Sequence, residues 1–283
     1  MPTSFGSRLG QAFGDYGQLC VGIDPHSSLL EEWGLSDDVV GLETFALTVL
    51  SAAVGRVGII KPQVSFFERH GSKGFAVLEK LARAAAETDL LVIMDAKRGD
   101  IGSTMEGYFD AWLGQTAPFV CDAITVSPYL GFDSLKPIMS AAVERGKGLF
   151  VLAATSNPEA KKLQQAKVAD QTVAASIYSE LQRINEVTSE GGADLGSIGA
   201  VVGATLNFGS VGLHSLTAEA ALTPILAPGF GAQGAELADA AAIFGAAKSQ
   251  VIASVSRSVL SAGAAGLSSA IERANAELAA GLA

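Results

Sequence analysis

Eight short apolar runs recur along the chain, and longer alanine-rich segments with helical spacing separate them. Their near-continuous apolar character, without clean alternation, is typical of parallel strands that are covered on both faces. The segments between them would supply the crossover helices, so the pattern predicts an α/β fold, a (β/α)8 TIM barrel. The expected strands are 19–24, 57–62, 90–96, 119–126, 148–154, 198–204, 223–228 and 250–255.

The length of 283 residues fits either two average domains or one closed barrel. Because no linker-like change of composition breaks the chain, we expect a single barrel domain over residues 1–283. An open doubly wound sheet is the structural alternative, but the turn after the first expected strand, GIDPHSS, lacks the G-x-G-x-x-G pattern that would favour it. The longest interval between strands, 158–195, is expected to form one long helix with a glycine-marked stop.

Charge and hydropathy exclude several classes of function. A formal net charge of −10 and a pI near 4.8 argue against non-specific nucleic-acid binding, which needs a Lys/Arg surface. Every apolar run falls short of the ~18 residues of a membrane helix, and the N-terminus lacks an apolar signal core. We therefore expect a soluble cytoplasmic protein without a nucleic-acid or membrane partner. Cys20 and Cys121 lie in apolar segments, as buried thiols in a reducing compartment do, and the histidines lack metal-ligand spacing.

Polar residues stand at the ends of six of the eight expected strands. Catalytic groups of a (β/α)8 barrel lie at the C-terminal strand ends and in the loops that follow. One such residue alone is usually an ordinary loop residue, but a set of them at one barrel end indicates a site. The set comprises Asp24, Lys61, Asp95, Lys97, Asp100, Ser156, Gln233 and Arg257.

The stretch MDAKRGD concentrates charge after the third expected strand. Asp95 and Lys97 are two apart, so on an extended strand both side chains would point to one face. Nearby carboxylates favour the ammonium form of the lysine, which suits an acid or an electrostatic anchor rather than an amine nucleophile. Asp100 follows a glycine and could face a neighbouring subunit. A structural ion-pair network at the barrel rim is the alternative interpretation.

The last two strand ends predict a phosphate site. The stretch PGFGAQG offers backbone N–H groups that can approach an anion, and Arg257 opens the helix after the eighth expected strand. The loops after strands seven and eight of this fold frequently hold a phosphate. A tight turn without a ligand is the alternative for the glycine-rich loop alone.

Several sequence pieces, taken together in chain order, carry a family resemblance. They are VGIDP, IIKPQ, MDAKRGDIGST, VLAATSNP, VVGAT and PGFGAQG, followed by SRS. The chain resembles the orotidine 5′-phosphate decarboxylases, especially the longer bacterial subgroup, over essentially its whole length. Two features depart from the commoner short form: the long 158–195 interval, and VSRS where a glycine often precedes the arginine.

The resemblance implies a charge network of Lys61, Asp95, Lys97 and Asp100, with Lys97 as the proton donor to C6 of the pyrimidine after CO2 leaves. It also implies a homodimer with shared active sites, in which Asp100 and Thr104 reach into the partner subunit's site and Thr104 lies near the ribose. Pyrimidine biosynthesis would be the setting, with a nucleotide as the small-molecule substrate.

The resemblance further implies the binding residues. Asp24 would hold a ribose hydroxyl, and Ser156 would read the pyrimidine edge. Arg257 and the backbone around Gly231 and Gln233 would bind the 5′-phosphate, and Gln233 would bridge from Ser156 to the phosphate as its loop closes. The sequence shows no pyridoxal-type or thiamine-type site, so no cofactor and no metal is expected and electrostatics must lower the barrier.

Two other functions remain open from the sequence. A metal-dependent lyase or isomerase that acts on a sugar phosphate in a related barrel would share the D-x-K-x-x-D strand. It would need a carboxylate ligand at the second strand end, where Lys61 stands as an ammonium. A non-catalytic nucleotide-binding barrel would be expected to have lost part of the charge network, whereas all four members are present.

Overall fold

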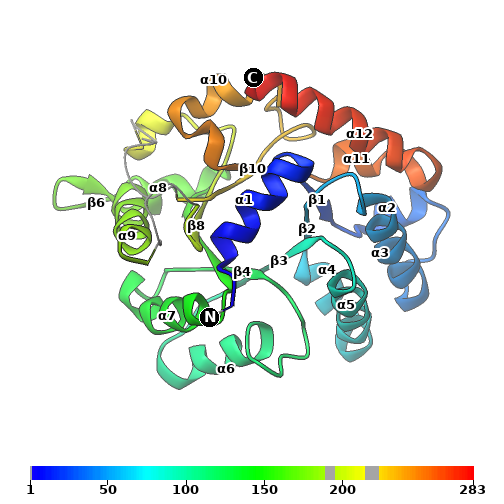
Figure 1. The fold of residues 1–283 in the computed structure, drawn as a ribbon, viewed down its shortest axis with the longest axis horizontal. Coiled ribbons are helices and arrows are strands. Elements are labelled where there is room, and N and C mark those ends of the chain that lie inside the picture. Colours follow the sequence, from blue (N-terminus) through cyan, green and yellow to red (C-terminus); the bar gives the residue numbers. More distant parts are fainter. Residues whose placement is uncertain (1, 189–194, 214–222) are drawn as a thin grey trace.

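Eight parallel strands close into a barrel in the computed structural model, which describes residues 2–188, 195–213 and 223–283 (Figure 1). Their order around the barrel is β1-β10-β9-β8-β5-β4-β3-β2. Each expected strand overlaps one observed strand, so the predicted (β/α)8 barrel is confirmed. The strands are β1 (Leu19–Ile23), β2 (Ile59–Pro62), β3 (Leu91–Arg98), β4 (Ala123–Val126), β5 (Gly148–Ala154), β8 (Ile198–Val202), β9 (Ile225–Pro228) and β10 (Val251–Val255).

Helices surround the barrel and bury their apolar faces against the outer sides of the strands (Figure 1). The longer ones are α3 (Val39–Ala53), α5 (Gly71–Ala86), α6 (Gly102–Trp112), α7 (Lys136–Glu144), α9 (Val173–Thr188) and α12 (Gly263–Leu282). Shorter ones are α2 (Ser27–Glu32), α4 (Val64–Glu68), α10 (Ala240–Phe244) and α11 (Arg257–Leu260). Within the described part of the chain, none of the helices has the length and apolar character to cross a membrane.

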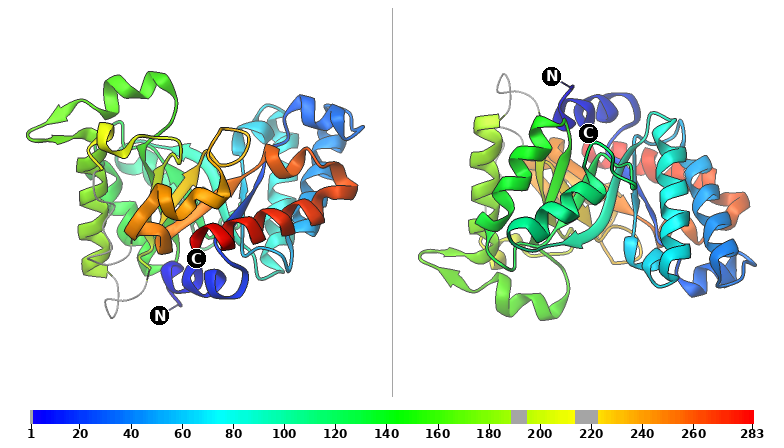
Figure 2. Two further views of the ribbon diagram at one scale, coloured as in Figure 1. Left: turned by 90° about the horizontal axis from the view of Figure 1, so that it is seen from above. Right: turned by 90° about the horizontal axis from the view of Figure 1, so that it is seen from below.

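Helix α1 (Phe5–Tyr16) closes one end of the barrel. Its N-terminus is capped by Ser4, whose side chain accepts a hydrogen bond from the Ser7 amide. Phe5, Leu9 and Ala12 are buried together with residues of the barrel interior, so the helix acts as a plug. Figure 2 shows α1 at one end of the barrel and the loop after β9 at the opposite end. The C-terminal strand ends are therefore the open mouth.

The interval after β5 differs from the expected single helix. It contains a 3-10 turn (Pro158–Ala160), α8 (Lys161–Gln164) and a hairpin of β6 (Lys167–Val168) and β7 (Gln171–Thr172) before α9. The prediction of one long helix is therefore wrong for residues 158–172, and the predicted glycine-marked stop lies at 189–194, outside the described residues. Ala169 has a φ of +54°, which turns the hairpin. Thr172 accepts a hydrogen bond from the Ala175 amide and so caps α9.

Candidate active site

A cavity of about 330 Å³ opens at the C-terminal strand ends. Such a mouth is where a (β/α)8 barrel carries its chemistry. The structure brings seven of the ten predicted site residues together in its lining: Asp24, Lys61, Asp95, Lys97, Ser156, Gln233 and Arg257. The other three, Asp100, Thr104 and Gly231, do not line it.

One carboxylate joins two lysines at the floor of this cavity. Lys61 Nζ lies 3.0 Å from Asp95 Oδ2, and Lys97 Nζ lies 2.6 Å from Asp95 Oδ1. The side chains of Lys61 and Asp95 are 8% and 12% exposed, whereas that of Lys97 is 45% exposed and faces the cavity. The arrangement therefore couples a buried ion pair to a second ammonium that a ligand could reach.

The charges of this cluster stabilise one another. Burial lowers the pKa of Lys61, but the carboxylates of Asp95 and Asp24 outweigh it and hold that pKa above its ordinary value. Burial raises the pKa of Asp95, but the two neighbouring ammonium groups outweigh it and hold that pKa below its ordinary value. Lys61 and Asp95 are therefore both ionised at neutral pH.

The backbone of Lys97 is not the extended strand that the spacing predicts. Its φ is +48°, in the left-handed region, and the pairing of β3 with β4 shifts register between Met94 and Arg98. Lys97 and Asp95 do meet, but a bulge brings them together rather than simple strand alternation. Backbone strain of this kind is concentrated at functional sites.

Asp24 presents a buried oxygen without a partner at the end of β1. Its Oδ1 accepts no hydrogen bond from the described residues, although it is shielded from bulk solvent. A buried oxygen without a hydrogen-bond donor destabilises the folded state, because its lost contact with water is not replaced. Asp24 also lines the cavity, so a hydroxyl-bearing ligand there could supply the donor.

The glycine-rich loop after β9 holds its own shape by backbone hydrogen bonds. The Gly231 N–H donates to the Ala235 carbonyl at 2.8 Å, so this amide is already used. Gly231 has a φ of +70°, and a Cβ there would lie 2.5 Å from Ser258 Oγ, so a glycine is required. The amides of Ala232 and Gln233 make no backbone hydrogen bond within the described residues and remain available to an anion.

Arg257 is the first residue of α11 and is exposed at the rim of the same cavity. No carboxylate of the described residues lies within ion-pairing distance of it, unlike the arginines that hold the barrel exterior together. The loop amides and this cation therefore form a positive rim at the place where the sequence predicts a phosphate.

Asp100 and Thr104 lie outside the cavity of their own chain. Asp100 Oδ1 accepts a hydrogen bond from the Ile101 amide at 2.8 Å, and Thr104 is exposed on α6. Apolar side chains are exposed nearby in sequence and on the loop after the neighbouring strand β4: Ile101 is 59% exposed and Tyr129 is 76% exposed. Within one chain the charge network therefore has three members in contact rather than four.

The structure adds residues that the sequence analysis missed. Thr125 lies inside β4 and touches both Asp95 and the Lys97 backbone. An apolar wall of Leu152, Val201 and Leu226 lines another part of the cavity. A polar residue within a short apolar strand gives no clear signal by itself, and inward-facing apolar residues look like core residues.

In comparisons with known proteins, a family model and the sequence relatives agree on one family. A model described as the orotidine 5′-phosphate decarboxylase / HUMPS family matches residues 17–271. The chain is 53% identical to the orotidine 5′-phosphate decarboxylase of Streptomyces coelicolor over 257 residues, which cover 90% of this chain and 89% of that protein. It is 49% identical to that of Salinispora arenicola over 282 residues, which cover 99% and 98%.

Solved structures agree with the sequence relatives. A crystal structure from Streptomyces avermitilis, assigned as an orotidine 5′-phosphate decarboxylase, superimposes with a TM-score of 0.90 at 49% identity, covering 99% of this chain and 96% of that chain. The OMP decarboxylase of Leishmania donovani superimposes with a TM-score of 0.76 at 27% identity, covering 99% of both chains.

Proposed function

The chain belongs to the orotidine 5′-phosphate decarboxylase / HUMPS family, and we propose that Lys61, Asp95 and Lys97 carry the chemistry of its reaction. The enzyme is a cofactor-independent carboxy-lyase of pyrimidine biosynthesis that converts orotidine 5′-phosphate to uridine 5′-phosphate and CO2. The observation that carries the proposal is the contact of one buried carboxylate with two ammonium groups on the cavity floor.

The proposed mechanism uses electrostatics and one proton transfer. The bond from C6 to the carboxylate breaks, CO2 leaves, and the electron pair stays on C6. The Lys97 ammonium stabilises this charge and donates a proton to C6, and the lysine then regains a proton from water. Asp95 holds Lys97 in place and crowds the substrate carboxylate until it departs. Lys61 keeps Asp95 ionised throughout.

The rest of the cavity is proposed to bind the nucleotide. Asp24 would accept a hydrogen bond from a ribose hydroxyl, which its unpartnered buried oxygen supports. Ser156 would contact the pyrimidine edge and Gln233 would bridge toward the phosphate. The phosphate itself would lie between Arg257 and the free amides of the loop after β9, since anions favour such backbone donors. Gly231 would serve by shaping this loop and not by donating its own amide.

We further propose a homodimer in which Asp100 and Thr104 complete the partner subunit's site. Three observations support this proposal: both residues lie outside their own cavity, the network inside one chain lacks its fourth member, and Ile101 is 59% exposed between them. A two-fold dimer would bury such a surface and exchange these residues reciprocally.

Mixed dimers test the shared site. The Lys97→Ala and Asp100→Ala homodimers should each be nearly inactive. After the two variants are unfolded and refolded together in equal amounts, about half of the dimers should be mixed, each with one intact site, so roughly a quarter of wild-type activity should return. If Asp100 acts within its own chain, every site keeps one lesion and mixing restores nothing. Mass spectrometry confirms that subunits have exchanged.

Loss of orotidine 5′-phosphate absorbance in the presence of EDTA tests the reaction itself. The relevant rival is a metal-dependent lyase or isomerase that acts on a sugar phosphate in a related barrel and shares the D-x-K-x-x-D strand. At the second strand end stands Lys61, an ammonium, where a metal would need a carboxylate ligand. Full turnover in EDTA supports the proposed chemistry, whereas loss of turnover in EDTA that added Mg²⁺ restores would contradict it.

A cytoplasmic location is also proposed. Both Cys20 and Cys121 are buried and free, as expected in a reducing compartment. Burial raises the pKa of the Cys20 thiol to about 12, so it stays protonated and unreactive beneath the site.

A further inference from the structure

The hydroxyl of Thr125 lies between the backbone of Lys97 and the carboxylate of Asp95. It donates to Asp95 Oδ1 at 2.9 Å and accepts from the Lys97 N–H at 2.9 Å. Both directions are fixed, because a backbone amide can only donate and an ionised carboxylate can only accept. Thr125 is 1% exposed, so no bulk water can take over either role.

Thr125 occupies a special place in the pairing of β3 with β4. Met94 pairs with Ile124 and Arg98 pairs with Val126, so the three residues 95–97 of β3 stand opposite the single residue Thr125. A bulge of this kind removes a backbone partner from the longer strand. The Lys97 amide takes the Thr125 side chain as its acceptor instead. The hydroxyl thus satisfies a backbone group that the bulge would otherwise leave unpaired.

The backbone of Lys97 needs such support. Lys97 is one of two non-glycine residues with positive φ in the described ranges, and the other, Ala169, lies in the distant hairpin. A residue in this conformation persists only where its surroundings fix it. Asp95 is fixed in a similar way, because its Oδ2 faces Lys61 and its Oδ1 receives both Lys97 and Thr125.

We propose that Thr125 is a positioning residue for the decarboxylation. Through one hydroxyl it holds Lys97 in its left-handed conformation and sets the rotation of the Asp95 carboxylate, so that the Lys97 ammonium is directed at C6. This inference rests on the proposed roles of Lys97 and Asp95. Thr125 itself would transfer no proton.

The test compares Thr125→Val, which keeps the shape and removes the hydroxyl, with Thr125→Ser, which keeps the hydroxyl. Since a misplacement of about 1 Å can cost 10²-fold, Thr125→Val should lower kcat roughly 10- to 100-fold. Thr125→Ser should stay within about threefold of wild type, and both variants should bind uridine 5′-phosphate within about threefold of wild type. The exchange of the C6 proton of uridine 5′-phosphate in D2O, followed by NMR, should fall in parallel with kcat, because the same lysine moves that proton in reverse.

Thr223→Val is the matched control. Thr223 is also 1% exposed, and its hydroxyl accepts a hydrogen bond from Asn185 away from the cavity. Its loss should lower the melting temperature and leave kcat unchanged. If Thr223→Val lowered kcat as much as Thr125→Val does, the loss would follow from removing any buried hydroxyl, and the positioning role of Thr125 would be overturned.

Other outcomes would overturn the proposal as well. They are a Thr125→Val enzyme with wild-type kcat, a Thr125→Ser enzyme as slow as Thr125→Val, or a loss of uridine 5′-phosphate binding that matches the loss of kcat. Lys97→Ala separates this proposal from the mechanism on which it rests. If Lys97→Ala retains turnover, the proton-donor role fails, whereas an inactive Lys97→Ala beside a fully active Thr125→Val overturns the positioning role alone.

Discussion

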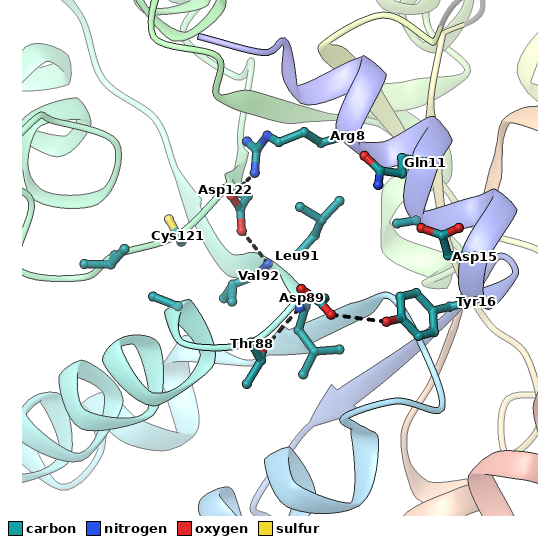
Figure 3. A pocket seen from close by; sticks show the side chains of 14 residues that line it. Arg8, Gln11, Asp15, Tyr16, Thr88, Asp89, Leu91, Val92, Cys121 and Asp122 are labelled. Atoms are coloured by element: carbon teal, nitrogen blue, oxygen red, sulfur yellow. Dashed lines mark hydrogen bonds and ion pairs between the residues drawn. The ribbon is translucent and has the colours of Figure 1, made fainter.

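The two ends of the barrel each hold a cavity, and the larger one is not the candidate site. The cavity at the closed end lies beneath α1 (Figure 3). Its volume is about 460 Å³, against about 330 Å³ at the open mouth. Both are lined by charged residues. Volume and charge alone therefore do not distinguish a site from a gap in packing.

What differs is whether the polar groups are already satisfied. At the closed end Arg8 pairs with Asp122, whose second oxygen accepts a hydrogen bond from the Val92 amide (Figure 3). Arg8 also donates to the Gly146 carbonyl. Within the described residues, no buried side-chain nitrogen or oxygen that lines this cavity lacks a partner. These groups join α1 to the strand starts, which is a stabilising role.

At the open mouth, by contrast, several of the described residues are strained or lack a partner. Asp24 has an unpartnered buried oxygen, Lys97 has a strained backbone and a half-exposed ammonium, and Arg257 has no carboxylate beside it among the residues described. Strain and unsatisfied groups of this kind reduce stability, and under the proposed function the bound nucleotide would supply the missing partners. The comparison predicts that substitutions at the mouth change activity and that those at the closed end change stability.

Lys97→Ala should have the largest effect. It removes the proposed proton donor and one of the two cations that compensate Asp95, so kcat should fall by about 10²- to 10⁴-fold or more. Binding of uridine 5′-phosphate and the melting temperature should change far less. A variant that keeps more than about a tenth of the wild-type kcat, a loss under ~1.4 kcal/mol, would rule out Lys97 as the main acid.

Arg257→Ala should come next. Loss of the rim cation should weaken the binding free energy of orotidine 5′-phosphate by about 1.5–3 kcal/mol and so raise its KM. The kcat should also fall if phosphate contact drives loop closure. The nucleoside orotidine has no phosphate and is the matched control substrate. If its turnover falls as much as that of orotidine 5′-phosphate, Arg257 has a different role.

Asp122→Ala probes the closed end. It leaves Arg8 and the Val92 amide without their partner, so the free energy of unfolding in urea should fall by roughly 1–3 kcal/mol. The kcat of the folded fraction should stay at the wild-type value, which assays well below the unfolding transition can check. A loss of kcat with an unchanged free energy of unfolding would contradict the prediction that the closed end acts on stability and the open mouth on activity.

Asp89→Asn should have the smallest effect. The charge of Asp89 raises the pKa of the nearby Tyr16, so the variant should bring that pKa down toward its ordinary value, as an ultraviolet titration of tyrosinate would show. Because the folded-state pKa is raised, stability falls as pH rises from the unfolded tyrosine pKa through the folded one, and Asp89→Asn should make this alkaline loss smaller. At neutral pH Tyr16 is protonated in both the folded and the unfolded state, so there is no tyrosinate for Asp89 to repel and the melting temperature and kcat should not change.

Local sequence patterns predicted most of the fold and most of the candidate site. The apolar runs identified all eight barrel strands, because continuous apolar character belongs to a strand covered on both faces whatever its neighbours are. The strand ends placed Asp24, Lys61, Asp95 and Arg257 at one mouth, because parallel strands share a direction. The interval 158–172 was predicted wrongly, since helical spacing does not reveal a turn that depends on the φ of Ala169.

The sequence by itself therefore determined most of the polar residues that reach the mouth, through periodicity and strand direction, although it also placed Asp100 there. Only the tertiary structure decided how they meet. The bulge that turns Lys97 toward Asp95, and the choice of Thr125 as their common partner, depend on the register of β3 against β4, which joins residues 28 to 30 positions apart in the chain. Likewise, the pairing that satisfies Arg8 with Asp122 spans 114 positions. Register and long-range pairing follow from how the whole barrel packs, and no local pattern encodes them.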